Sequence, residues 1–220
     1  MSARKGLGQG LLPRRWAIPL AVLWAVALVV LVVLAWHLYR TGTATVADAQ
    51  LDRRLQARLG GHRRLERLFI SFGSPRGVVL GSLGLAVVMV SLRWWRGALL
   101  ALLGAPLTGL VTEKVLKPLV GVPSPSGAPL SFPSGHTSGA VSLALTAAIL
   151  LLAHEAVPLL PTALRLLLGL CALTVAGGTG VAMVIEGAHR VTDVVGGVAT
   201  AAVIVLALAA ALDRVRREPA

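Results

Sequence analysis

Two of the five histidines lie in polar stretches that are suited to chemistry. The first, His136, follows Pro133, Ser134 and Gly135 at the start of a long apolar run. Proline is favoured in the first turn of a helix, where the unpaired N–H groups form the positive end of the helix dipole. Such a turn can bind an anion, glycine lets the anion approach the backbone, and imidazole exchanges protons near neutral pH. From these residues alone, a phosphate site with an acid–base group and a plain polar helix start are both open.

The second histidine, His189, stands four residues before Asp193. On a helix this spacing places the two side chains one turn apart on the same face. A carboxylate there can hold imidazole in one tautomer and stabilise its cation, which leaves the other ring nitrogen free to attack. A single His–Asp pair is more often structural. Two histidines that share a membrane face with Lys117 and a helix-start anion site are a stronger sign of function.

The composition puts these residues in a membrane protein. Of the 220 residues, 56% are hydrophobic and 14% are charged, whereas about 25% are charged in an average soluble domain. Several apolar runs approach the ~20 residues needed to cross a bilayer. Most basic residues behind the net charge of +12 flank these runs, where they suit anionic lipid surfaces better than nucleic acid. We therefore expect one all-α integral membrane domain, with the bilayer and no nucleic acid as its partner.

Six apolar runs predict six transmembrane helices within residues 16–212. The expected helices cover residues 16–39, 77–92, 97–115, 135–152, 160–185 and 191–212. Between the first two, segment 40–75 repeats leucine and arginine at near-helical spacing and is interrupted by Gly60 and Gly61. This pattern predicts two short amphipathic helices on the membrane surface, with a lid or lipid-headgroup contact as the functional alternative. Residues 116–134 are rich in Pro, Gly and Ser and predict an irregular loop.

Six spans place both ends of the chain on the same side of the membrane. Basic segments 1–15 and 213–220 are expected to be cytoplasmic tails at the cytoplasmic (inner) membrane. Basic residues are nearly equal in number on the two sides, so this orientation rests on the first helix, which usually dominates. Segment 40–75 and the loops that carry the two histidines then lie on the extracytoplasmic face.

The order of these motifs resembles the type 2 phosphatidic acid phosphatase superfamily, which also contains the vanadium haloperoxidases. The family pattern is Lys, six residues, Arg-Pro; then Pro-Ser-Gly-His; then Ser-Arg, five residues, His, three residues, Asp. Lys117 and Pro125 fit the first motif, and residues 133–136 fit the second in full. His189 and Asp193 fit the end of the third motif. The resemblance extends from the first predicted helix to the last.

The resemblance implies a role for each matching residue. His189 would attack phosphorus and form a phosphohistidine, Asp193 would orient it, and His136 would protonate the leaving oxygen and then activate water. The phosphate would be held by a lysine side chain and by backbone N–H groups, from Lys117, Ser134 and Gly135. No metal or other cofactor is implied, and the sequence offers no tight cluster of metal ligands.

Two arginines that bind phosphate in the family are absent in register. Ser124 stands in place of the first motif's arginine, and Ala182 and Met183 stand in place of Ser-Arg in the third. Arginine binds phosphate through a planar bidentate fork that serine and methionine cannot form. Lys117 would therefore be the one cationic side chain of the motifs that binds the phosphate.

Other charged residues lie near the motifs. Glu186 adds a negative charge before the third motif's histidine, and Arg190 is expected to point to a different side from that histidine. Together with Ser124, these two are the accessory candidates for the site. Glu113 and Lys114 are interpreted as interfacial anchors or members of an ion pair.

Our leading interpretation is a membrane phosphatase that hydrolyses a phosphate monoester or diphosphate of a lipid. Phosphatidic acid, phosphatidylglycerol phosphate and polyprenyl phosphates or diphosphates are all compatible with it, and the oligomeric state is open. Loss of one donor to a developing oxyanion lowers a rate by ~10²–10³. The absence of two arginines therefore supports an alternative, a catalytically weak or inactive lipid-binding or scaffold protein of the same fold. A haloperoxidase is a third and more distant possibility.

Overall fold

The computed structural model describes residues 10–43, 45–127, 130–152 and 160–214, and within these ranges the regular structure is entirely helical. The α-helices are α1 (Ala17–Thr41), α2 (Val46–Leu59), α3 (Arg63–Gly73), α4 (Pro75–Ser91), α5 (Trp95–Val111), α6 (Lys117–Val120), α7 (Gly135–Leu152), α8 (Thr162–Ile185) and α9 (Val191–Arg214). Among the described residues, five helical segments are long and apolar enough to cross a membrane, or six when α3 and α4 count as one bent span. The prediction of an all-α, multi-pass membrane protein is confirmed.

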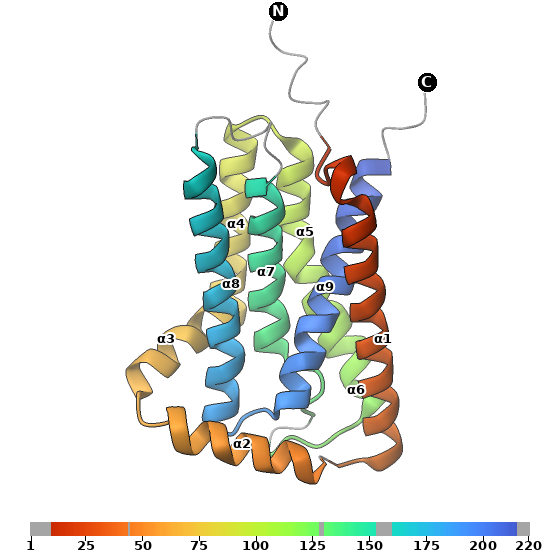
Figure 1. Cartoon of the computed structure of the whole chain (residues 1–220), viewed down its shortest axis with the longest axis vertical. Helices are drawn as coiled ribbons and strands as arrows, with labels where there is room; N and C mark the ends of the chain where they lie inside the picture. Colours follow the sequence, from red (N-terminus) through yellow and green to blue (C-terminus); the bar gives the residue numbers. More distant parts are fainter. Residues whose placement is uncertain (1–9, 44, 128–129, 153–159, 215–220) are drawn as a thin grey trace, which may run out of the picture.

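The long helices stand side by side, and α2 lies across one end of them (Figure 1). Helix α7 is central, because it packs against α5, α8 and α9. Small residues on α7, among them Gly139 and Ala140, are buried, which lets the neighbouring helices approach closely. The first residues of α1 and the last residues of α9 lie at the end of the bundle away from α2 (Figure 1). This arrangement agrees with an even number of membrane crossings.

The outer helices expose their apolar side chains. Only 11% of the most apolar window of α1 is buried inside the protein, compared with 50% for α9. Large side chains such as Ile18, Val29 and Val33 of α1 are more than half exposed. In a bilayer these side chains contact lipid tails, so the exposed apolar surface is where a membrane protein needs it.

Helix α4 begins at a sharp break after α3. Ser74 has an extended backbone before Pro75, and its Oγ accepts a hydrogen bond of 3.1 Å from the N–H of Gly77. A residue before proline avoids the helical region, and a serine cap favours a new helix start. The two helices meet at 58°, and together they are long and apolar enough to cross a membrane. Segment 40–75 therefore contains two short helices, and the second leads directly into α4.

The predicted loop 116–134 is shorter than expected. A π-helical turn, Thr112–Leu116, continues α5 directly into α6. Pro118 is the second residue of α6 and donates no backbone hydrogen bond to the turn before it. The helix ends at Gly121, whose φ of 70° is in the left-handed region. Lys117 consequently lies on a helix and not in a loop.

The two predicted tails lie partly outside the described residues, which exclude 1–9 and 215–220. The described part of the first tail is not free. Leu11 is fully buried, and the N–H groups of Leu11 and Leu12 donate to the Asp213 carboxylate at 2.8 and 2.9 Å. Arg96 lies 3.6 Å from the same carboxylate. Asp213 therefore binds the backbone of Leu11 and Leu12 to the end of α9.

Candidate active site

A pocket of about 540 Å³ brings together elements that are far apart in the sequence. Its polar lining comes from α5 with its continuation, the loop before α7, the first turn of α7 and the loop before α9; these side chains are Glu113, Lys117, Ser124, Ser126, His136 and His189. Its apolar wall comes from the α3–α4 junction and α5, with Val78, Val79, Ala105 and Pro106. The pocket therefore combines a charged end with an apolar wall inside the helical bundle.

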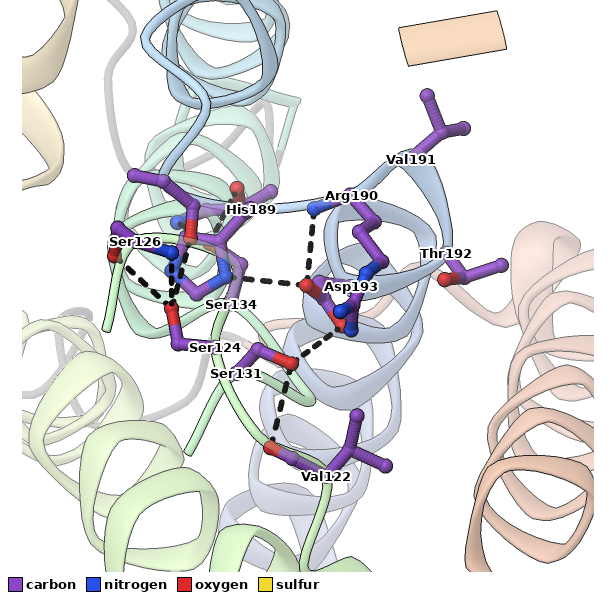
Figure 2. A network of polar contacts seen from close by, with 12 residues as sticks. Val122, Ser124, Ser126, Ser131, Ser134, His189, Arg190, Val191, Thr192 and Asp193 are labelled. Carbon is purple, nitrogen blue, oxygen red and sulfur yellow. Dashed lines mark hydrogen bonds and ion pairs between the residues drawn. The ribbon is translucent and has the colours of Figure 1, made fainter. Parts of the chain in front are cut away.

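His189 and Asp193 face each other beside this pocket. The Nδ1 atom of His189 lies 3.4 Å from Oδ2 of Asp193, which is fully buried (Figure 2). Contacts of this kind are often long in a structure without substrate and shorten when substrate binds. His189 lies in the loop just before α9 and Asp193 lies in the first turn of α9, because the helix begins at Val191. The expected helix 191–212 has the same start, so the pair joins a loop to a helix turn and does not lie on one continuous helix.

Three hydrogen bonds hold the pair in position. The Asp193 carboxylate accepts from the N–H of Arg190 at 2.9 Å and from the hydroxyl of Ser131 at 3.3 Å (Figure 2). The N–H of His189 donates to the carbonyl of Met183, near the end of α8, at 3.2 Å. The imidazole is thus held between the end of α8 and the start of α9, with its Nδ1 side toward the carboxylate.

Ser134 links the two histidine motifs but does not offer its N–H to the pocket. Its Oγ accepts a hydrogen bond of 3.0 Å from the hydroxyl of Thr137, and its N–H donates to the carbonyl of Asp193 at 2.9 Å. The predicted role of this N–H in holding phosphate is therefore incompatible with the structure, because the group is already paired and Ser134 is fully buried. The bond instead joins the start of α7, which carries His136, to the start of α9.

Gly135 and Lys117 both line the pocket, and a carboxylate lies between them. Lys117 Nζ is 2.7 and 3.0 Å from the two carboxylate oxygens of Glu113. A Cβ atom at Gly135 would collide with Oε1 of Glu113, so the absence of a side chain at this position makes room for the carboxylate. Glu113 is half-exposed and occupies the helix-start position where an anion was expected.

Glu113 is the site residue that the sequence interpretation missed. It was predicted to be an interfacial anchor or a member of an ion pair, and the ion pair is the arrangement that the structure contains. Its partner is the one cation expected to bind phosphate. The available signal was the spacing of Glu113 and Lys117, four residues apart with the acid first, which favours an ion pair on a helix.

The two positions that lack the family arginines both face the pocket. Ser124 and Met183 belong to its lining, and the Ser124 hydroxyl donates to the carbonyl of Ala188 at 3.3 Å. The other two accessory candidates, Glu186 and Arg190, do not line the pocket. Glu186 is exposed at the end of α8, and Arg190 Nη1 donates to the carbonyl of Pro123 at 3.3 Å. The missing cations are therefore not replaced by Arg190.

No three His, Cys, Asp or Glu side chains form a metal-binding group within the part of the chain that the structure describes. The functional groups that line the pocket are two imidazoles, the Glu113 carboxylate, the Lys117 ammonium and the hydroxyls of Ser124 and Ser126.

The fold and the site together define a multi-pass membrane protein with a histidine-lined pocket near one end of its bundle. The PAP2 superfamily model matches residues 97–217, more than half of the chain, and the chain therefore belongs to this superfamily. Its fold is similar to that of the transmembrane PAP2-type phosphatidylglycerolphosphate phosphatase from Bacillus subtilis, with a TM-score of 0.68 and 23% sequence identity over 89% of this chain and 98% of the other. No curated protein matches the sequence.

Proposed function

We propose that this protein is a membrane phosphatase that removes a phosphate group from a lipid through a phosphohistidine at His189. One observation carries the proposal. His136, in the first turn of α7, and His189, in the loop before α9, line a single pocket with Lys117, and a buried carboxylate contacts Nδ1 of His189. In this arrangement a carboxylate orients the nucleophile His189, and a second acid–base group, His136, and a cation, Lys117, lie nearby.

The proposed reaction has two steps. In the first, Nε2 of His189 forms a bond to phosphorus while the bond to the lipid oxygen breaks, and His136 donates a proton to that oxygen. In the second, His136 takes a proton from water as the water oxygen attacks phosphorus and the bond to His189 breaks. Asp193 stabilises the imidazolium form of His189 and fixes its tautomer. Inorganic phosphate leaves, and both histidines regain their starting protonation states.

The apolar wall of the pocket supports a lipid substrate. Val78 and Val79 of α4 and Ala105 and Pro106 of α5 line the same cavity as the histidines. A phosphate at the polar end can therefore be attached to a chain that lies along the apolar wall. Phosphatidic acid, phosphatidylglycerol phosphate and polyprenyl phosphates or diphosphates share this combination of groups.

Phosphate release by the purified protein tests the proposal. The wild type should release phosphate from at least one member of a panel of these lipids, and His189→Ala should release none. A panel on which the wild type and His189→Ala are equally inactive would contradict the proposal.

A second candidate is a lipid-binding protein without turnover. It is favoured by a specific observation, because Lys117 is paired with Glu113 and neutral side chains occupy both arginine positions. Saturable binding of a lipid phosphate by a wild-type protein that releases no phosphate would support this second candidate.

A further inference from the structure

Helix α2 is attached to the rest of the protein by an unusual set of contacts. Asp48, Asp52 and Gln56 are spaced four residues apart and therefore share one face of the helix. Asp48 is the sole buried residue of α2, all of whose residues are described, and it is only 4% exposed. On the same helix Arg53, Arg54 and Arg58 are exposed. An amphipathic helix is ordinarily held by an apolar stripe, but α2 is held mainly by polar groups.

These polar groups bind both ends of the loop that carries His189. The Asp48 carboxylate accepts from the N–H of Thr192 at 3.1 Å and from its hydroxyl at 2.6 Å. Asp52 accepts from the N–H of Val191 at 3.1 Å. At the other end of the loop, Gln56 donates to the carbonyl of Val184 at 3.0 Å. The segment between Val184 and Thr192 is thus connected at each end to α2.

The start of α9 depends on these carboxylates for its hydrogen bonds. The first N–H groups of a helix have no partner within it and are usually paired by a side chain of the preceding residue. Here the N–H groups of Val191 and Thr192 are paired by Asp52 and Asp48, from a helix more than a hundred residues earlier in the sequence. Charge-assisted bonds at the positive end of a helix are stronger than neutral ones. The position of this helix start is therefore set from outside.

We propose that Asp48 and Asp52 are positioning residues, which determine the position of the His189 imidazole because they fix the first turn of α9. His189 is two residues before Val191, so a shift of this turn displaces the imidazole relative to His136 and Lys117. Small displacements of a nucleophile lower a rate strongly because the reacting atoms lose alignment. The inference rests on the proposed phosphatase function only where activity is the readout. Helix α2 lies outside residues 97–217, which the superfamily model matches.

Three variants are tested: Asp48→Asn, Thr192→Val and the double variant that combines these two changes. The control is Arg53→Gln, which changes an exposed residue on the same helix. An asparagine keeps the shape of the side chain but loses the charge and one acceptor. Asp48→Asn should lower kcat by at least ~tenfold with KM within twofold, because alignment and not binding is lost. The kcat of the double variant should be no lower than that of the poorer single variant. Both changes affect the same contact, the hydrogen bond between the Asp48 carboxylate and the Thr192 hydroxyl. Arg53→Gln should behave as wild type.

Hydrogen exchange gives a second readout that needs no activity. Residues 186–193 should exchange faster in Asp48→Asn than in the wild type, while the long helices and the thermal midpoint change little. Unchanged exchange in this loop, or a loss of kcat that accompanies general unfolding, would overturn the inference. If the wild type releases no phosphate, the proposed phosphatase function fails, and the exchange measurement alone decides whether α2 positions the loop.

Discussion

At the residue scale, Glu113 determines how Lys117 can bind an anion. Both carboxylate oxygens lie within 3.0 Å of the ammonium, and the carboxylate packs against Gly135 at the start of α7. A phosphate dianion that binds in this position meets a cation whose charge is already neutralised. It must displace the carboxylate or bind beside it, and either arrangement weakens binding.

Replacing Glu113 with glutamine should therefore strengthen anion binding. The side chain keeps its size while one negative charge beside Lys117 is removed. We expect Glu113→Gln to tighten vanadate inhibition by about tenfold, which corresponds to about 1.4 kcal/mol. Lys114→Gln, a change at a neighbouring exposed residue, serves as the control. Equal vanadate affinity in the wild type and Glu113→Gln would show that the ion pair does not limit binding.

Arginines introduced at the two neutral positions should also strengthen the site. Ser124 and Met183 both line the pocket, so the double change Ser124→Arg and Met183→Arg adds two bidentate donors toward one anion. We expect tighter vanadate inhibition and at least ~tenfold faster monoester hydrolysis, a modest part of what such donors contribute elsewhere. The single changes should help less, because the two forks act on one anion. Failure of the folded double variant to bind vanadate would contradict the proposed geometry of the pocket.

The sequence predicted His136, His189 and Lys117 as parts of one site, because each stands in a motif whose type and spacing limit its role. The sequence did not predict how Ser134 and Glu113 are used. The Ser134 N–H is taken by the Asp193 carbonyl only because α7 and α9 begin close together. The direction of Glu113 depends on the π-helical turn that contains it. Both facts arise from packing, which local patterns do not encode.

At the element scale, α2 carries an aspartate, Asp52, whose pKa is shifted by its surroundings. Burial raises the pKa of Asp52 above the ordinary aspartate value, the N–H of Val191 opposes this shift, and the negative charges of Asp48 and Asp193 add to it, with Arg190 opposing. These are the charged groups that face Asp52 from α2, the loop and α9. A raised pKa means that the folded protein binds this proton more tightly than the unfolded chain does.

Asp52 should therefore make stability depend on pH in a defined direction. Its stabilising contribution is fully present below the ordinary aspartate pKa of about 3.9 and is lost as pH rises through the raised value. Asp52→Asn has no carboxyl group at this position, so this loss should be absent. As pH rises from about 4, its thermal midpoint should therefore fall less than that of the wild type. Arg53→Gln, on the exposed side of α2, should keep the wild-type slope. An identical slope in Asp52→Asn and the wild type would refute this assignment.

The helices themselves were largely predictable, because apolar length and helix-start residues determine them. Residues 135–152 were predicted as a helix and are α7 without change. The errors occur where one element continues into another. The composition of residues 116–134, rich in Pro, Gly and Ser, predicted an end to the third helix at residue 115, but a π-helical turn continues the helix to Val120. The role of Asp48 and Asp52 was not visible, because their partners are more than a hundred residues away.

At the scale of the whole molecule, α2 lies at the end of the bundle away from the start of α1 and the end of α9 (Figure 1). The pocket is lined by the start of α7 and the loop before α9, and the residues that follow this loop are bound by α2. We propose that the α2 end is extracytoplasmic and that the chain resides in the cytoplasmic membrane, because the first helix is preceded by basic residues. A lipid phosphate in the outer leaflet would then have direct access to the pocket.

Thiol labelling tests this orientation. Ser126, in the loop beside the pocket, and Ser91, at the opposite end of α4, are both exposed, and each can be changed to cysteine in a Cys171→Ala background. An impermeant thiol reagent should label Ser126→Cys in cells with a permeable outer barrier, and it should label Ser91→Cys only after lysis. The reverse pattern would place the pocket on the cytoplasmic side.

In the proposed mechanism, His189 carries the phosphoryl group during turnover. An aryl phosphate with a good leaving group needs little help from an acid, so His136→Ala should still complete the first step and then lack the base for the second. Mass spectrometry of this variant after rapid quenching should find a phosphate on His189, and His189→Ala should show neither the adduct nor turnover. Phosphate release that persists in His189→Ala, or an adduct on another residue, would contradict the mechanism.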